Sequence, residues 1–232
     1  MGERGASLEA LQEVTRRLRR ECPWDREQDE RSIVPHTVEE AYELADAVQG
    51  GDDARMLDEL GDVLFQVVFL ALLLEERGAG DLGVVAEHCM RKLVRRHPHV
   101  FGEAQARSAG EVLRNWDEIK RSEPGRDTST FGDLPRGLPA LTLARKVRRR
   151  AAVAGVELPD GAASRAELVQ QLDGLDGAGD RDARFEAVGD LLLAAAALAQ
   201  GLSVDGELAL RAACQRFREG VEGVERAEGG AR

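Results

Sequence analysis

The sequence predicts an all-α protein built of two homologous helical units, on three observations. Apolar residues recur with the period of an α-helix through most of the chain, and segments containing Gly or Pro separate the periodic runs. The run 63–74 is apolar nearly all round, apart from Gln66, so this helix needs neighbours on every side, as in a helix bundle. The second half repeats the pattern of the first when the chain is shifted by 128 residues, from Asp52 to Asp180 for example.

The first expected helix ends before Pro23 and carries its apolar residues at helical spacing, at Leu8, Leu11, Val14 and Leu18. The segment Cys22-Pro23-Trp24-Asp25 then forms a bend. We expect Asp25 to cap the helix that follows and Trp24 to pack against the bend, with contact to a substrate base as the alternative for Trp24.

The next two helices form a hairpin. Thr37, followed by two acidic residues, is typical of a helix N-terminus, and the helix is expected to run to about Val48. The segment Gly50-Gly51-Asp52-Asp53 carries turn residues, and a long second helix runs from there to Arg77. Shorter helices are predicted over 82–96 and 111–120. The segment 121–135, rich in Pro, Gly, Ser and Thr, is expected to be a linker or mobile loop.

Two pairs of acidic residues lie at matching distances on either side of the hairpin turn. Glu40 and Glu43 are spaced i, i+3 before it, and Glu59 and Asp62 repeat this spacing after it. With a rise of about 1.5 Å per residue, Glu43 and Glu59 each lie roughly 11 Å from the turn, and Glu40 and Asp62 lie about one turn further. The four carboxylates are therefore expected to meet at one height of the hairpin.

A cluster of carboxylates with no cation expected among them repels itself unless it is protonated or binds a cation. Hard oxygen ligands suit Mg²⁺ or Mn²⁺. A solvated helix face is the alternative, but the apolar run after Asp62 places the carboxylates at the rim of a core, which favours the metal site. A di-iron bundle would use Glu-x-x-His, whereas Asp46 and Asp62 occupy the corresponding positions here.

Lys92, Arg95 and Arg96 share a face of their expected helix and are candidates for binding phosphate groups. Basic residues at a helix C-terminus are the alternative, since they interact favourably with the helix dipole. Beside four carboxylates, however, these cations fit a metal-bound triphosphate.

These motifs resemble a known family. Glu39-Glu40-x-x-Glu43 followed by Glu59-x-x-Asp62 is similar to the signature of MazG-type nucleoside triphosphate pyrophosphohydrolases, members of the all-α NTP pyrophosphatase superfamily. The resemblance extends to the segments CPWD at 22–25, RRHPHVF at 95–101 and WDEIK at 116–120. It covers most of residues 8–121, in the order of the family.

The resemblance implies hydrolysis of a nucleoside or deoxynucleoside triphosphate to the monophosphate and pyrophosphate, helix-bundle packing and a homodimer. The four paired carboxylates would hold Mg²⁺, and the neighbouring Glu39 would accept the proton of the attacking water or orient a ligand. By family position, Trp116 and Lys120 are candidates for contact with the base or ribose. Narrower members that act on dCTP, dUTP or phosphoribosyl-ATP are the alternatives within the superfamily, and a non-catalytic helical regulatory module is the alternative outside it.

The second half keeps the core pattern and loses the ligands. Under the 128-residue shift, Leu168 replaces Glu40, Gln171 replaces Glu43 and Ala187 replaces Glu59, so only Asp190 and the neighbouring Glu167 remain. We therefore predict a catalytic domain over 1–121, a linker over 122–135, a degenerate repeat over 136–225 and a flexible tail over 226–232. Whether the repeat is regulatory or only structural stays open.

Composition limits the possible partners and location. The formal net charge of −11 argues against binding to nucleic acid or an anionic membrane. No apolar run is long enough to span a membrane, and the N-terminus has no signal core, so we expect a cytoplasmic protein. Cys22, Cys89 and Cys214 are odd in number and far apart, which fits reduced thiols. Base preference, the number of metal ions and the cellular role do not follow from the sequence.

Overall fold

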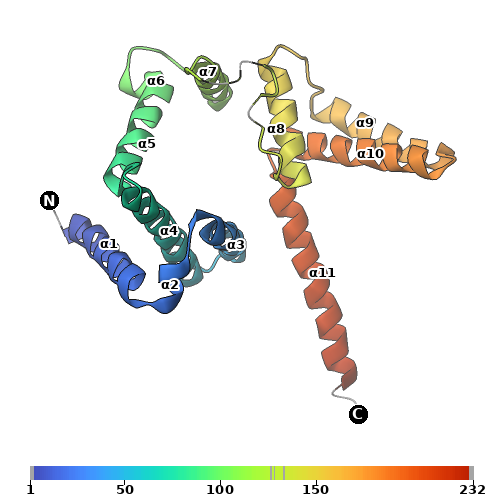
Figure 1. The fold of residues 1–232 in the computed structure, drawn as a ribbon. Coiled ribbons are helices and arrows are strands. Elements are labelled where there is room, and N and C mark those ends of the chain that lie inside the picture. The colour runs from blue at the N-terminus through green and yellow to red at the C-terminus, as the bar shows by residue number, and fades with distance from the viewer. Residues whose placement is uncertain (1–2, 126, 128, 133, 230–232) are drawn as a thin grey trace. The chain divides into compact units, whose positions relative to one another are not determined.

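The structure is a computed structural model that describes residues 3–125, 127, 129–132 and 134–229. Every regular element in this part of the chain is a helix, which confirms the all-α fold (Figure 1). The chain divides into two compact units, Met1–Glu103 and Ala104–Arg232. This structural division falls earlier than the boundary at 121 that the sequence predicted for the catalytic domain.

The first unit contains six helices in the part that the structure describes. They are α1 (Glu3–Glu21), α2 (Pro23–Glu27), α3 (Glu30–Gly50), α4 (Asp53–Glu76), α5 (Leu82–Arg96) and the short α6 (Pro98–Phe101). The helices α3 and α4 form the hairpin expected from the sequence, and α1 lies against α4 (Figure 1).

Helix α3 begins two turns earlier than the sequence predicted. Asp29, not Thr37, is the N-cap, because its side chain accepts hydrogen bonds from the backbone N–H groups of Arg31 and Ser32. The Ser32 hydroxyl in turn accepts from the Asp29 N–H at 2.9 Å and completes a capping box. Pro35 lies in the second turn and does not end the helix. The Thr37 hydroxyl donates instead to the Ile33 carbonyl, within the helix.

The turn between α3 and α4 forms as expected. Gly51 ends α3 with a φ of 67°, in the left-handed region that favours glycine. Asp52 then caps α4, because its carboxylate accepts hydrogen bonds from the N–H groups of Ala54 and Arg55. The two caps fix the length of the connection and so the height at which residues of α3 and α4 meet.

The core of the first unit lies on the α3-facing side of α4. Phe69 and Leu73 of α4 pack against Ile33 of α3, and all three are buried. The expectation that the run 63–74 is buried on every side was wrong for a single chain, since Leu64 and Val67 are 38% and 39% exposed. The reason is that α1, α3 and α5 pack against α4, but no described helix of the first unit covers the side that carries Leu64 and Val67.

Arg19 holds the bend between α1 and α3. Its guanidinium donates to the carbonyl oxygens of Asp25 and Gln28, at 2.5 and 2.9 Å, and pairs with Glu76 of α4. Asp25 lies inside α2 and is buried, so the expectation that it caps the next helix was wrong. Trp24, expected to pack in the bend, is 51% exposed instead.

The second unit contains α7 (Ala109–Arg121), α8 (Ala140–Val153), α9 (Gly161–Gly174), a 3₁₀ turn (Leu175–Gly177), α10 (Arg181–Gly201) and α11 (Gly206–Gly229). Here α9 and α10 form a second hairpin (Figure 1). Asp180 caps α10 by accepting from the Ala183 N–H, so the 128-residue shift relates it to Asp52, which caps α4. Helix α11 continues into the expected tail 226–232, of which residues 230–232 lie outside the described part.

No single helix among the described residues is long and apolar enough to cross a membrane. The helices α10 and the first part of α11 meet this criterion only when taken together, and they are bent by 105° relative to each other.

Candidate functional site

Three carboxylates converge where the two helices of the first hairpin face each other. One oxygen from each of Glu40 and Glu43 on α3 and Glu59 on α4 lies within 4.8 Å of the others. Glu59 is buried, with 7% of its surface exposed, and Glu40 is half-buried. The symmetric spacing about the turn therefore brings these side chains together, as the sequence predicted.

Asp62, the fourth predicted ligand, is exposed and lies three residues after Glu59, on the same face of α4. Burial raises the pKa of Glu40 above its ordinary value, and neighbouring carboxylates raise this pKa further, Asp62 most among them. The repulsion shows that the four carboxylates act on one another at this height of the hairpin. Glu39 is exposed, with its carboxylate 3.7 Å from Nδ1 of His36, and its charge also contributes to the raised pKa of Glu40.

Arg55 is a cation at the cluster that the sequence analysis missed. Its Nε donates to the Glu59 carboxylate at 3.3 Å. The signal was the i, i+4 spacing of the two residues on α4, which brings their side chains together on one face. Arg55 thus offsets part of the negative charge, on the side of the cluster nearest the hairpin turn.

The donor set fits a hard divalent cation. Oxygen ligands of Mg²⁺ lie about 2.1 Å from the ion in an octahedron, so they are about 3 to 4.2 Å apart. The three carboxylate oxygens, within 4.8 Å of one another, need shifts of at most about 1 Å each to reach such distances. A cation would also relieve the repulsion that raises the pKa of Glu40.

The candidate phosphate-binding cations lie on α5. Lys92 is half-buried and Arg95 is exposed, whereas Arg96 is only 5% exposed, so the three do not present one common surface. Within the described part of the first unit, α5 packs against α4 and α6 and not against α3. The single chain therefore does not bring these cations to the side of the cluster that α3 forms.

The two remaining predicted residues belong to the second unit. Trp116 and Lys120 are half-buried on α7. The carboxylate of Asp117 between them accepts two hydrogen bonds from Arg149 of α8, at 2.7 and 3.0 Å, which fixes α7 to α8. Contact of Trp116 and Lys120 with the base or ribose stays a prediction.

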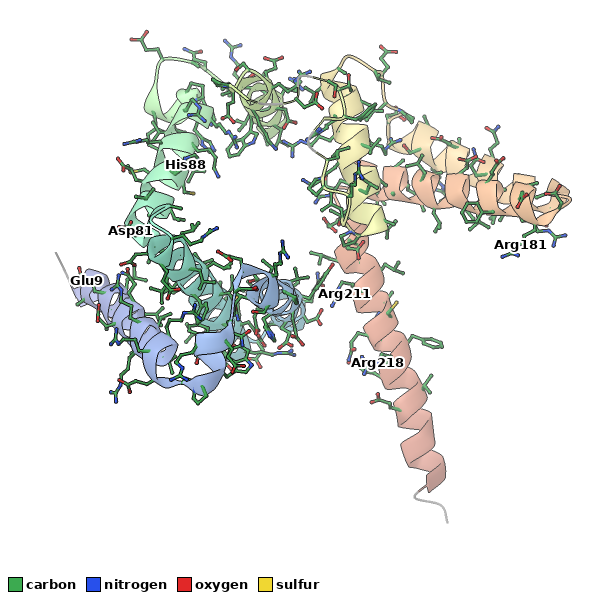
Figure 2. All side chains as sticks on the ribbon, viewed as in Figure 1. Glu9, Asp81, His88, Arg181, Arg211 and Arg218 are labelled. Atoms are coloured by element: carbon green, nitrogen blue, oxygen red, sulfur yellow. The ribbon has the colours of Figure 1, made fainter. Side chains whose placement is uncertain are left out.

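No other group of acidic, His or Cys side chains suited to a metal occurs among the described residues. The second hairpin therefore lacks such a cluster in its described part. The adjacent His88 and Cys89 are exposed on α5, which begins at its cap Asp81 (Figure 2). They form no such group with other described residues, as expected for neighbours that point to different sides of a helix.

Comparison with known proteins relates this chain to one family. The model of the MazG nucleotide pyrophosphohydrolase domain matches residues 28–101, which include all four paired carboxylates and the α5 cations. The nucleoside triphosphate pyrophosphohydrolase/pyrophosphatase MazG of Thermotoga maritima is 38% identical, over 97% of this chain and 88% of its own length. The nucleoside triphosphate pyrophosphohydrolase of Escherichia coli K12 is 36% identical, over 94% and 87% of the two chains.

Proposed function

Because this chain belongs to the MazG nucleotide pyrophosphohydrolase family, we propose that it hydrolyses nucleoside triphosphates to nucleoside monophosphate and pyrophosphate. The observation that supports an active site in this chain is the convergence of Glu40, Glu43 and Glu59 in one hairpin. Cleavage falls between the α and β phosphorus atoms.

The carboxylates of Glu40, Glu43, Glu59 and Asp62 hold Mg²⁺, and Mn²⁺ is the closest substitute because it accepts the same oxygen ligands. When bound, the metal supplies charge neutralisation of the phosphates and lowers the pKa of a water that attacks phosphorus. Arg55 holds the Glu59 carboxylate in place from the side of the turn. Glu39 lies next to the cluster and accepts the proton of the water or orients a ligand.

The leaving pyrophosphate needs positive charge, and Lys92 and Arg95 on α5 supply it. Arg96 belonged to the same predicted group, but its burial suits a supporting role within the first unit. Trp116 and Lys120 contact the base or ribose.

A homodimer is the state in which we propose that the enzyme works. The uncovered side of α4 carries an apolar stripe, defined by Leu57, Leu60, Leu64 and Val67, whose first member is 74% exposed. A self-complementary stripe of this kind suits pairing with the same stripe of a second copy about a two-fold axis. A second copy also offers a route by which the α5 cations of one chain reach the carboxylates of the other.

The second unit serves as a structural or regulatory copy without a metal site of its own. Its hairpin retains exposed apolar residues at the shifted positions of the stripe, Phe185, Val188 and Leu192, although the ligands are lost. A unit that retains its apolar contact residues but has lost the metal ligands is suited to a role in packing or subunit contact. We place the enzyme in the cytoplasm, since its three cysteines are free, as is usual in a reducing compartment.

Pyrophosphate release from a nucleoside triphosphate in Mg²⁺ tests the proposal, with phosphate measured separately. Glu43→Gln and Asp62→Asn each remove a charge from the ligand set at nearly constant volume, so both should abolish turnover and leave the fold intact. Either variant turning over at the wild-type rate, with wild-type metal dependence, contradicts the site. A panel of triphosphates identifies the preferred base and separates this function from the narrower dCTP, dUTP and phosphoribosyl-ATP activities.

A further inference from the structure

A small cavity in the second unit has a basic wall. It lies between the end of α7, the C-terminal half of α8 and described residues of the segment 127–132, and its volume is about 50 Å³. The helices α7 and α8 contact each other beside it (Figure 1). We call this space the cation cavity, because its wall includes three basic residues, Lys120, Arg121 and Arg150.

The guanidinium of Arg150 makes no hydrogen bond or ion pair within the described part of the chain. Its side chain is half-buried, so it has lost part of its hydration, and an anion would replace the lost water. Arg121 is also half-buried, and among the described residues only one of its five N–H groups has a partner, the Val153 carbonyl at 3.3 Å. The wall therefore offers several guanidinium donors to a ligand.

The two carboxylates in the wall do not cancel this charge. Asp117 accepts two hydrogen bonds from Arg149, at 2.7 and 3.0 Å, so a cation outside the wall already balances it. Asp127 accepts a hydrogen bond from the backbone N–H of Ser129 at 2.8 Å. Hydrogen bonds from Ser129 lower the pKa of Asp127, and the charge of Arg150 lowers it further. Two guanidinium groups thus exceed the one remaining carboxylate, before Lys120 is counted.

The size of the cavity limits the ligand to one small group. A buried water needs about 10 to 15 Å³ of such space, so about 50 Å³ holds on the order of four water molecules. An orthophosphate ion, with four oxygens around one phosphorus atom, matches this number, whereas a nucleoside is several times larger. A carboxylate has only two oxygens for the donors of two arginines, Lys120 and the Thr130 hydroxyl, so a tetrahedral oxyanion uses this wall more fully.

We propose that the cation cavity binds a phosphate group, supplied as orthophosphate or as one end of pyrophosphate. Arg121 and Arg150 donate to its oxygens from α7 and α8, and Lys120 and Thr130 complete the set of donors. The site belongs to the second unit and uses neither the carboxylates nor the α5 cations of the first.

Lys120 links the cation cavity to the reaction. We have proposed that it contacts the base or ribose, and a phosphate in the cavity competes with that contact for the same ammonium group. Bound phosphate should therefore inhibit hydrolysis, which gives the second unit a regulatory role. This consequence rests on the proposed function, whereas the binding of phosphate does not.

The first test measures binding by isothermal titration calorimetry, with orthophosphate added to the metal-free protein in a chloride buffer. Arg150→Gln should weaken binding about tenfold or more, because it removes charged hydrogen bonds to the ligand. The matched control is Lys146→Gln, since Lys146 is also half-buried, lies one turn earlier on the same face of α8 and does not line the cavity. Lys146→Gln and Lys92→Ala should both bind phosphate like the wild type.

Three results would overturn the proposal. Wild-type affinity in Arg150→Gln would exclude the cavity as the site. An equal loss in Lys146→Gln would mean that phosphate responds only to the overall charge of α8. Loss of binding in Lys92→Ala would place the ligand on α5, in the first unit.

A second variant separates binding from folding. Thr130→Val keeps the shape of the side chain and removes its hydroxyl, so it should weaken phosphate binding about threefold and leave the urea midpoint unchanged. Where Arg150→Gln does not fold, this variant decides, and wild-type affinity in it contradicts the site.

A series of anions defines the ligand. Sulfate should bind within a few-fold of orthophosphate because it is also tetrahedral, and acetate should bind more weakly. Equal affinity for acetate and orthophosphate overturns the assignment to a phosphate group. Tighter binding of orthophosphate than of pyrophosphate identifies the free ion as the ligand, and the reverse order identifies the reaction product.

The final test measures nucleoside monophosphate formation by chromatography in Mg²⁺. At ten times its Kd, orthophosphate should slow the wild type about twofold or more, whereas Arg150→Gln should keep the basal rate and resist the inhibition. Equal inhibition of the two proteins overturns the regulatory role. If the wild type hydrolyses no triphosphate, the proposed function is wrong, and calorimetry still decides whether the cation cavity binds phosphate.

Discussion

The substitution Glu40→Gln should stabilise the metal-free protein while weakening its response to Mg²⁺. Glu40 is surrounded by carboxylates whose charges, together with burial, raise its pKa. A neutral amide of nearly the same size removes its share of the repulsion. The same change removes one charged ligand, so the variant binds Mg²⁺ less tightly than the wild type does.

The magnitude follows from the distances in the cluster. The oxygens of Glu40, Glu43 and Glu59 lie within 4.8 Å of one another. Two unit charges at this separation repel by about 0.9 kcal/mol in water and about 3.5 kcal/mol at an effective dielectric constant of 20. Because Glu40 is only half-buried and Arg55 offsets Glu59, the lower end applies, and the repulsion relieved is about 1 to 2 kcal/mol.

The assay is urea unfolding with and without Mg²⁺ at neutral pH. With a chelator present, the Glu40→Gln variant should unfold at a higher urea concentration than the wild type. The control is Glu9→Gln, at an exposed position of α1 (Figure 2), and it should unfold at the wild-type concentration. At 100 times its Kd, Mg²⁺ should stabilise the wild type by about 2.7 kcal/mol, and the variant by less at the same concentration. A metal-free variant that is less stable than the wild type, or an unchanged increment from Mg²⁺, refutes the reasoning.

Four further outcomes are expected. As the pH falls from neutral through the raised pKa of Glu40, the metal-free wild type should gain stability relative to Glu40→Gln, because the folded state binds this proton more tightly; parallel curves would contradict this. Asp62→Ala should abolish turnover and Asp190→Ala should leave it nearly intact; loss of activity in a folded Asp190→Ala protein of unchanged oligomeric state would refute the assignment of catalysis to the first unit. Lys92→Ala should reduce triphosphate use far more than metal affinity, and equal losses measured by metal titration would point to a supporting role. Leu57→Glu should shift the protein toward monomer in analytical ultracentrifugation, whereas the control Leu8→Glu, at an exposed leucine of α1, should not. An unchanged mass of the Leu57→Glu variant would exclude the apolar stripe as the interface.

Hydrophobic period and turn chemistry were sufficient to predict the helices of the hairpin and their connection. The helix predicted over 82–96 matches α5, and the turn predicted at Gly50–Asp53 forms, with Gly51 ending α3 and Asp52 capping α4. The start of α3 was missed, because Asp29 and Ser32 cap it upstream of Pro35, and a proline within a helical pattern usually marks a boundary.

The sequence by itself determined which carboxylates meet, because equal distances from one turn force Glu40, Glu43 and Glu59 to the same height of an antiparallel hairpin. Only the tertiary structure decided which side chains around them are buried. Helical spacing fixes the direction of a side chain, but not whether another element covers it. For that reason only the structure shows that Gln66 is buried, that Trp24 is exposed and that one side of α4 is uncovered, since each depends on where α1 and the bend lie.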